Sequence, residues 1–292
     1  MRVGLFLPSI SPIATPEFLT AYAETAEDAG FDRIWIGEHV VVFDEYESKY
    51  PYSDDGKLAL GGESGMLELF TTLTYLAATT STIRVGSAVC LLPQRNPVYT
   101  AKEAATVDWL SKGRLDLGLG IGWTWEEFGA VAAPFPRRGA RMKDYVDVLR
   151  ACWRDDPSTF HGEFYDLEPC RVFPKPVQDG GPPVYFGGES DAALRRVARM
   201  GDGWHGFNHT PETTTTSLAR LEPMLADAGR SLADIDITVA SYMQAVTPAD
   251  LPGYADAGAQ ELVLTGFGFD PDGARETLKK MGDEFVGAAH AL

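Results

Sequence analysis

Short runs rich in β-branched and apolar residues recur along the 292-residue chain, and a longer amphipathic stretch follows each run after a turn. Runs of this length and composition are typical of buried strands. The predicted strands cover residues 2–7, 33–36, 83–90, 115–119, 184–186, 203–207, 235–240 and 261–265.

The amphipathic stretches between these runs predict helices. They lie at residues 16–29, 67–79, 97–110, 138–153, 190–200, 211–228, 248–257 and 272–285. Strands that alternate with helices indicate parallel pairing with crossover connections. Eight such units predict an α/β fold of the (β/α)8 TIM-barrel type, although a doubly wound open sheet gives the same alternation. Because no linker interrupts the pattern, residues 1–292 are predicted to form a single domain.

Two segments are too long for a minimal strand–helix unit, so insertions are expected after strands 2 and 4. Residues 40–66 are polar, aromatic and glycine-containing, and long loops in compact domains tend to be functional. This segment is a candidate lid. Residues 154–182 alternate polar and apolar positions around Gly162, which predicts a small hairpin before the fifth strand.

The composition narrows the classes of partner. A formal net charge of −17 argues against general attraction to nucleic acid or to an anionic membrane surface. No apolar run approaches membrane-spanning length, so we expect no membrane partner and a small-molecule ligand. The three cysteines lack CxxC spacing, which indicates neither disulfides nor a metal site and fits a reducing cytoplasm.

The second predicted strand ends at Glu38 and His39, where a barrel would place its chemistry. Histidine is suited to proton transfer near neutral pH, and an adjacent carboxylate can orient it. A histidine that is merely hydrogen-bonded at the rim explains the same residues.

The third and fourth strands carry small residues near their ends. Residues 86–88 allow close approach to the backbone or, equally, tight barrel packing. Residues 118–122 contain three glycines without the spacing of a dinucleotide-binding loop, so we reject that motif. Trp123 and Trp125 follow, and they could wall a flat ring or cover the barrel mouth.

The fifth strand is followed by Gly187, Gly188, Glu189 and Ser190, after which a helix is predicted. Unpaired N–H groups at a helix start favour anions, so this turn is a candidate phosphate site. Capping of the helix by Ser190 alone is the competing interpretation.

A basic cluster occupies the start of the helix before the hairpin: Arg137, Arg138, Arg141 and Lys143. The helix dipole disfavours cations at this end, so a nearby anion would explain them. A solvated face that pairs with the many carboxylates of the chain explains them as well.

Six motifs in order resemble the luciferase-like flavin and deazaflavin oxidoreductases, over nearly the whole chain. The similarity is greatest to the bacterial branch that depends on coenzyme F-420, a deazaflavin. The motifs are "GLFLP", "AEDAGFDRIWIGEH", "IRVGSAVCLLPQRNP", "GRLDLGLGIGW", "RRGARMKDYVDVLRACW" and "PVYFGGESDAALRRVARMGDGWHG".

The resemblance implies a tricyclic cofactor across the C-terminal mouth of a TIM barrel. His39 would be the catalytic proton-transferring residue, with Glu38 assisting it. A non-prolyl cis peptide at Ala88–Val89 would press against the central ring. The cofactor-binding set implied by the resemblance and by the position of Trp123 is Ala88, Val89, Trp123, Gly187, Gly188, Glu189 and Ser190; no metal is expected.

The expected reaction is hydride transfer between coenzyme F-420 and a small organic substrate, and the alternative is an FMN-dependent monooxygenase that uses O2. Some deazaflavin dehydrogenases of the family carry Glu, and three residues later Asn, after the fourth strand. Trp123 and Glu126 stand at those positions, which puts sugar-phosphate chemistry in doubt. The resemblance also makes a homodimer the expected state.

Overall fold

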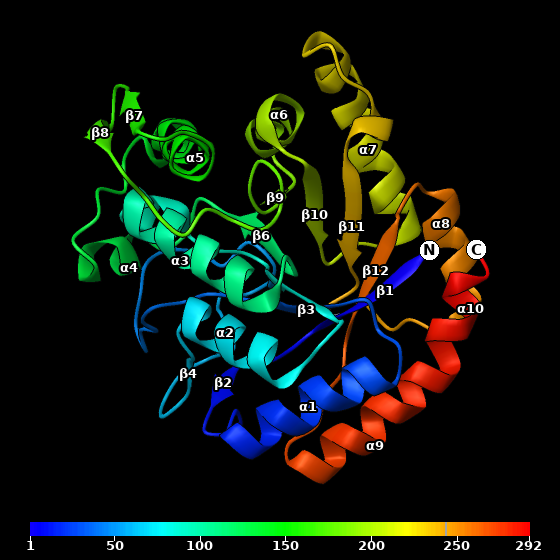
Figure 1. The fold of residues 1–292 in the computed structure, drawn as a ribbon. Helices are drawn as coiled ribbons and strands as arrows, with labels where there is room; N and C mark the ends of the chain where they lie inside the picture. The colour runs from blue at the N-terminus through cyan, green and yellow to red at the C-terminus, as the bar shows by residue number, and fades with distance from the viewer. Residues whose placement is uncertain (243) are drawn as a thin grey trace.

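The computed structural model describes residues 1–242 and 244–292 and shows a closed barrel of parallel strands in the order β1-β12-β11-β10-β9-β6-β5-β3. β1 pairs with both β12 and β3, so the sheet has no free edge and the open-sheet alternative is excluded (Figure 1). The barrel strands are β1 (Arg2–Phe6), β3 (Arg33–Ile36), β5 (Arg84–Ser87), β6 (Leu115–Leu119), β9 (Val184–Gly187), β10 (Gly203–Phe207), β11 (Asp236–Ala240) and β12 (Glu261–Thr265).

Helices surround the barrel, which explains why strands such as β3 and β6 are buried along their whole length. The α-helices are α1 (Pro16–Asp28), α2 (Leu69–Thr79), α3 (Pro97–Ser111), α4 (Trp125–Ala130), α5 (Arg138–Arg154), α6 (Asp191–Met200), α7 (Pro211–Asp227), α8 (Leu251–Asp256), α9 (Pro271–Met281) and α10 (Gly287–His290). Among the described residues, no helix has both the length and the apolar character needed to cross a membrane.

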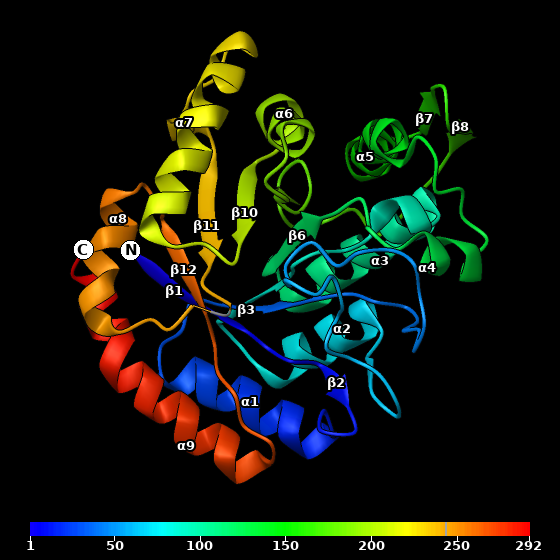
Figure 2. The same cartoon turned by 180° about the vertical axis from the view of Figure 1, so that it is seen from behind.

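Helix α1 illustrates how the sequence sets these elements. Thr15 caps it by accepting a hydrogen bond from Phe18 N, and Pro16 occupies the first helical position, where its missing N–H costs nothing. The helix packs beside α9, so the first and last thirds of the chain meet (Figure 2). The Met1 amino group also donates to Ala289 O at 2.9 Å, which joins the two ends of the chain.

The two insertions differ in form. Residues 37–64 form a turn-rich segment that ends at the short strand β4 (Gly65–Met66), which pairs with β2 (Ile10–Ser11). Before β9, strands β7 (Ser158–His161) and β8 (Asp166–Cys170) form the antiparallel hairpin that the sequence predicts.

The structure also departs from the predicted boundaries. The third barrel strand stops at Ser87, short of the predicted residue 90, and Cys90 rejoins the sheet through an isolated bridge to Leu119. The last predicted helix continues beyond α9 as a π-helical turn, Gly282–Val286. Helix α4 and the β2–β4 pair were not predicted, because they are too short to show a hydrophobic period.

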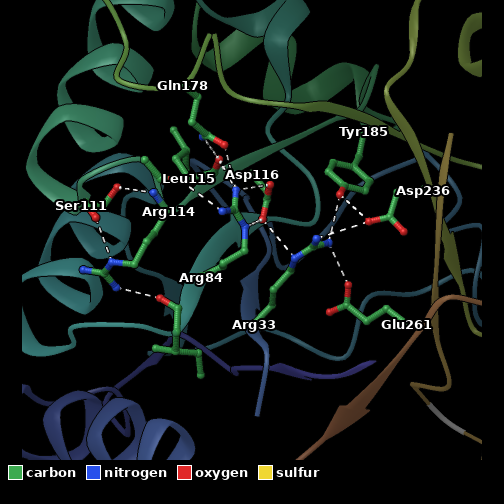
Figure 3. A network of polar contacts seen from close by, with 12 residues as sticks. Arg33, Arg84, Ser111, Arg114, Leu115, Asp116, Gln178, Tyr185, Asp236 and Glu261 are labelled. Atoms are coloured by element: carbon green, nitrogen blue, oxygen red, sulfur yellow. Dashed lines mark hydrogen bonds and ion pairs between the residues drawn. The ribbon is translucent and has the colours of Figure 1, made fainter. Parts of the chain in front are cut away.

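The N-terminal end of the barrel is closed by an ion network rather than by apolar side chains. Five of the eight strands begin with a charged residue: Arg2, Arg33, Arg84, Asp236 and Glu261. Figure 3 shows the Arg33 guanidinium at the centre, between carboxylates from three other strands. Its nitrogens lie 2.8 Å from Glu261, 3.1 Å from Asp116 and 3.3 Å from Asp236.

The network balances its own charge. Arg84 binds Asp116 through two nitrogens, at 2.6 and 2.7 Å, and Arg2 contacts Asp236. Burial alone would lower the pKa of Arg33, but Glu261, Asp116 and Asp236 together raise it above its ordinary value. Three arginines therefore face three carboxylates, and the network as a whole carries no net charge.

We expect Arg33→Met to lower the free energy of unfolding by about 3–5 kcal/mol, because it leaves buried carboxylates without their central partner. Urea unfolding at pH 7 measures the change. Arg275→Met is the control, since its exposed pair with Asp272 contributes less than about 1 kcal/mol. Equal effects of the two substitutions would contradict a structural role for the network.

Candidate active site

A cavity of about 430 Å³ lies over the C-terminal ends of the barrel strands. The strand ends contribute Phe6, Gly37, Ala88, Gly187 and Phe207, and the insertion after β3 contributes Tyr50, Pro51, Tyr52 and Leu58 to Leu60. The lining is mainly aromatic and aliphatic. A concave, mostly apolar pocket with a few polar groups at this face is where TIM-barrel enzymes hold their ligands.

His39 lines this cavity and is held by a buried carboxylate. Its Nδ1 lies 3.1 Å from Glu127 Oε2, and the Glu127 side chain is only 1% exposed. A carboxylate next to Nδ1 favours the tautomer with the proton on that nitrogen, which leaves Nε2 as the second ring nitrogen for a ligand.

Glu127 is itself fixed by neighbours on two other segments. Its Oε1 accepts a hydrogen bond from Val40 N at 2.7 Å, and its Oε2 accepts one from Gln94 Nε2 at 3.2 Å. Glu127 lies on α4, which follows β6, and its carboxylate therefore links this helix to the segments that follow β3 and β5. A side chain tied at both oxygens holds the imidazole in one orientation.

Glu38, which was predicted to assist His39, is hydrogen-bonded to other residues. Its carboxylate accepts hydrogen bonds from Leu91 N at 2.6 Å and from Arg95 Nε at 2.9 Å. These bonds anchor the chain after β5 beneath the cavity rim. The acid that touches His39 is therefore Glu127, whereas Glu38 holds the backbone next to the Ala88–Val89 bulge.

The peptide bond between Ala88 and Val89 is cis, as the resemblance implies. Both residues line the cavity, and glycines make room for the Val89 side chain. A Cβ on Gly120 would lie 2.3 Å from Val89 Cγ2, and one on Gly187 would lie 2.9 Å from Val89 Cγ1. The glycines after β6 and at the end of β9 are thus required by packing, which explains a pattern that resembles a nucleotide loop without being one.

Three of the four residues predicted in the turn after β9 line the cavity, and Glu189 does not. Gly187, Gly188 and Ser190 line the cavity, and Gly188 has a φ of 101°, which suits glycine alone. Ser190 caps α6 by accepting from Ala193 N at 3.2 Å. The Glu189 carboxylate turns toward the insertion and accepts from Tyr52 Oη and Phe207 N, both at 3.1 Å.

The basic cluster divides into two groups. Arg137 pairs with Glu163 and Lys143 with Asp147, as expected of a solvated face, while Arg141 donates to backbone carbonyl oxygens. Arg138 instead lies close to Arg196 of α6, and burial together with the neighbouring positive charge lowers the pKa of Arg196. Arg196 lines the cavity beside Ser190. Arg138 itself donates from Nε to Gly122 O at 3.0 Å and lies over the Phe135 ring, so Arg196 is the cavity-lining cation at this point.

Aromatic side chains of the insertion meet Trp123 over the cavity. The Trp123 ring centroid lies 5.8 Å from that of His39 and 5.4 Å from that of Tyr50. Helix α4 holds the insertion below these rings, because Glu126 accepts from the backbone N–H of Glu47 and Ser48 and from the Ser48 hydroxyl. Trp123 is thus part of an aromatic wall on one side of the cavity.

The barrel and the cavity at its C-terminal end define an enzyme built on a luciferase-type TIM barrel. Comparisons with known proteins agree with this class. The chain matches the luciferase-like monooxygenase family over residues 1–280 and belongs to it. This makes it an oxidoreductase of a family whose members depend on F420 or a flavin. An uncharacterized protein of Mycobacterium tuberculosis is 33% identical over 214 residues, 73% of each chain. The F420-dependent glucose-6-phosphate dehydrogenase of Kineococcus radiotolerans is 29% identical over 233 residues, 77% of this chain and 63% of that one.

Solved structures share the fold at low identity. The F420-dependent tetrahydromethanopterin reductase of Methanopyrus kandleri superposes with a TM-score of 0.76 at 17% identity, covering 98% of each chain. The oxygenating constituent of 3,6-diketocamphane monooxygenase of Pseudomonas putida, in complex with FMN, also gives 0.76, at 13% identity and 98% coverage of each. Both cofactor types therefore occur on this scaffold.

Sequence reasoning missed Glu127 and Arg196. Glu127 lies 88 positions from His39, and nothing local marks it except an acidic pair at the start of a short helix. Arg196 lies three residues after Ala193, which also lines the cavity, so the two share one side of α6. That spacing is a signal that helical periodicity could have used.

His205 on β10 also lines the cavity, and burial, followed by the charges of Arg33 and His209, lowers its pKa to about 3. The unfolded chain therefore binds a proton between pH 6.5 and 3 that the folded chain does not. Stability attributable to His205 is fully present above pH 6.5 and is lost as the pH falls through that range.

We expect the stability difference between the wild type and His205→Leu to change by about 1.4 kcal/mol per pH unit below pH 6.5, with the wild type losing more. Urea unfolding of both proteins at pH 7, 6, 5 and 4 measures it. Parallel pH profiles would show that His205 is not held neutral.

Proposed function

We propose that this protein is a coenzyme F-420-dependent oxidoreductase that transfers a hydride between the deazaflavin and a small organic substrate. The observation that carries the proposal is the His39–Glu127 pair, set in an apolar, aromatic-walled cavity with Arg196 at its margin. The resemblance and the F420-dependent relative from Kineococcus radiotolerans support the same cofactor class.

The residues present fit a flat ring with an anionic tail. Ala88 and Val89 offer an apolar surface for the ring, and Gly187 and Gly188 leave the backbone open to it. Ser190 and the start of α6, together with Arg196 and Arg138, would hold a phosphate. Glu189 would act through the insertion instead, because its carboxylate is bound to Tyr52 and Phe207.

The bound deazaflavin would supply hydride chemistry at its central ring. His39 would give or accept the accompanying proton at Nε2, while Glu127 stabilises the Nδ1–H tautomer and the charged form of the ring. Tyr50, Tyr52 and Trp123 would exclude water from the substrate, with the Tyr52–Glu189 hydrogen bond joining the insertion to the β9 turn.

An FMN-dependent monooxygenase that uses O2 is the second candidate. The FMN-bound structure from Pseudomonas putida has the same fold, and a single phosphate fits beside Arg196 as well. A homodimer and a cytoplasmic location are two further proposals. A homodimer fits the exposed apolar residues Tyr99, Trp109 and Leu110 on α3, and a cytoplasmic location fits the three free cysteines.

Cofactor titration tests the proposal directly. Fluorescence titration of the purified protein with coenzyme F-420, FMN and riboflavin should show binding in that order of affinity, because riboflavin lacks the phosphate. Arg196→Gln should weaken binding of the two phosphorylated cofactors by about tenfold and leave riboflavin unchanged. Arg195→Gln, at the exposed neighbouring position, is the matched control.

Oxygen consumption then separates the two candidates. Turnover with coenzyme F-420 that consumes no O2 supports hydride transfer, whereas FMN-dependent O2 uptake coupled to substrate oxidation supports the monooxygenase. Failure of the wild type to bind any of the three cofactors would reject both.

Substitutions at the pair test the proton-transfer step. His39→Ala should lower kcat about 100-fold with little change in cofactor affinity, since general acid–base groups contribute that much or more. Glu127→Gln should lower kcat by about tenfold and change its pH profile, because the neutral amide no longer stabilises the charged imidazole. Initial rates of cofactor oxidation or reduction with a panel of small organic substrates measure both.

Glu222→Gln, on the exposed side of α7, is the control for Glu127→Gln. An unchanged pH profile in Glu127→Gln would show that the carboxylate only packs against the histidine.

A further inference from the structure

The cavity lining divides between two sectors of the barrel. Strands β5, β6 and β9 are adjacent, and their ends supply Ala88, Val89 and Gly187, the surface proposed above for the cofactor ring. The other five strands, β10, β11, β12, β1 and β3, are consecutive as well. Their ends form a second surface, which the proposed cofactor contacts do not use.

The second sector carries aromatic side chains, which the insertion extends into a continuous arc. The ring centroids of Trp123 and Tyr50 are 5.4 Å apart, and those of Tyr50 and Tyr52 are 5.6 Å apart. The centroids of Tyr52 and Phe207 are 4.8 Å apart, and those of Phe207 and Phe6 are 6.1 Å apart. All five residues line the cavity, and we call them the aromatic arc.

Both ends of the aromatic arc meet the segment that carries His39. At one end, the Trp123 ring centroid lies 5.8 Å from that of His39. At the other end, a Cβ on Gly37 would lie 3.4 Å from Phe6 Cζ, so Phe6 packs on the backbone two residues before His39. A molecule held by the arc is therefore next to the proposed proton-transferring residue.

The lining beside the arc offers no counter-charge to a ligand. Apart from histidines, the described lining residues include two side chains that are ionised at neutral pH, Glu38 and Arg196. Glu38 is bound to Arg95 Nε at 2.9 Å, and Arg196 lies on α6, next to the cofactor sector. A carboxylate or phosphate beside the arc would lose its hydration without gaining a partner.

A cationic ligand is disfavoured for the same reason. The faces of Trp and Tyr rings attract cations, but a buried cation also needs a carboxylate. Glu38 is the one carboxylate among the described lining residues, and Arg95 already neutralises it. The neighbouring rings of the arc meet edge to face or tilted, the packing that a further uncharged ring can join.

We infer that the aromatic arc is the substrate site and that it takes an uncharged ring compound, held with its reacting group beside His39. The inference rests on the proposed function for the reaction that this compound undergoes. It adds the substrate class, and it places the substrate on the side of the cavity opposite the cofactor sector.

Four matched ketones test the inference through binding alone. Acetophenone is an uncharged ring compound, 4-acetylbenzoate and 4-acetyl-N,N,N-trimethylanilinium add a negative or a positive charge to the same ring, and hexan-2-one has no ring. Isothermal titration calorimetry gives their dissociation constants for the free protein and for the protein saturated with FMN or coenzyme F-420. We expect acetophenone to bind at least about tenfold more tightly than either charged analogue and about fivefold more tightly than hexan-2-one.

Phe207→Leu tests the arc itself, because it removes one ring and keeps an apolar side chain. It should weaken binding of acetophenone about fivefold, while hexan-2-one and FMN stay within about twofold of the wild type. Phe173→Leu, at a half-exposed position outside the cavity, is the matched control. A loss of FMN affinity equal to that of acetophenone would assign the arc to the cofactor ring and overturn the inference.

Met66→Lys provides a second test by adding a cation beside the arc. Met66 lines the cavity, and its Cε lies next to Phe6, since a Cβ on Gly37 would lie 3.8 Å from it. The substitution should reverse the preference, so that 4-acetylbenzoate binds about fivefold more tightly than acetophenone. Val177→Lys, at an exposed apolar position outside the cavity, is the control and should keep the preference of the wild type.

The outcomes separate this inference from the proposed function. The inference is overturned if acetophenone does not bind, if either charged analogue binds as tightly, or if Phe207→Leu binds all four ketones as the wild type does; the cofactor titration and the O2 measurement are unaffected by these results. If the wild type binds no cofactor, the proposed function fails, and the free protein still tests the arc. Circular dichroism confirms that each variant is folded.

Discussion

The Arg33 network is the constraint on which the rest of the structure depends. An eight-stranded barrel has an interior only wide enough for side chains, and charges inside it must be matched. Five strands begin with Arg2, Arg33, Arg84, Asp236 and Glu261, and β6 adds Asp116, so three arginines meet three carboxylates and their formal charges cancel. Space for a ligand remains at the C-terminal end.

A second layer of side chains lies between the Arg33 network and the cavity. Trp35 and Tyr185 occupy space that glycines leave free, since a Cβ on Gly86 would lie 2.5 Å from Trp35 and one on Gly203 would lie 2.3 Å from Tyr185. The two rings are buried and meet edge to face, with centroids 5.4 Å apart, so they fill the barrel interior next to the network. His205 packs on Trp35 and also lines the cavity.

The fold could be predicted because strand and helix periods are local, whereas much of the site could not. All eight barrel strands follow from apolar runs, and His39 and the β9 turn follow from their positions at strand ends. Glu38 was predicted to assist His39, but its carboxylate is bound to Leu91 N and Arg95. Both residues follow the end of β3, where strand alternation no longer determines which side chains meet. Glu127 comes from a helix 88 positions away, and no local pattern records that approach.

The choice of cofactor is difficult to predict for a related physical reason. FMN and a deazaflavin present the same flat ring system, so contacts to the ring alone would not distinguish them. The two cofactors differ in the charge and length of the tail, which would leave the cavity between α6 and the start of α5. Arg196 lines the cavity from α6, and Arg138 lies near it at the start of α5, in a chain whose net charge of −17 repels anions overall. Because the net charge of the chain repels anions, local cations such as these are the feature expected to distinguish a polyanionic tail from a single phosphate.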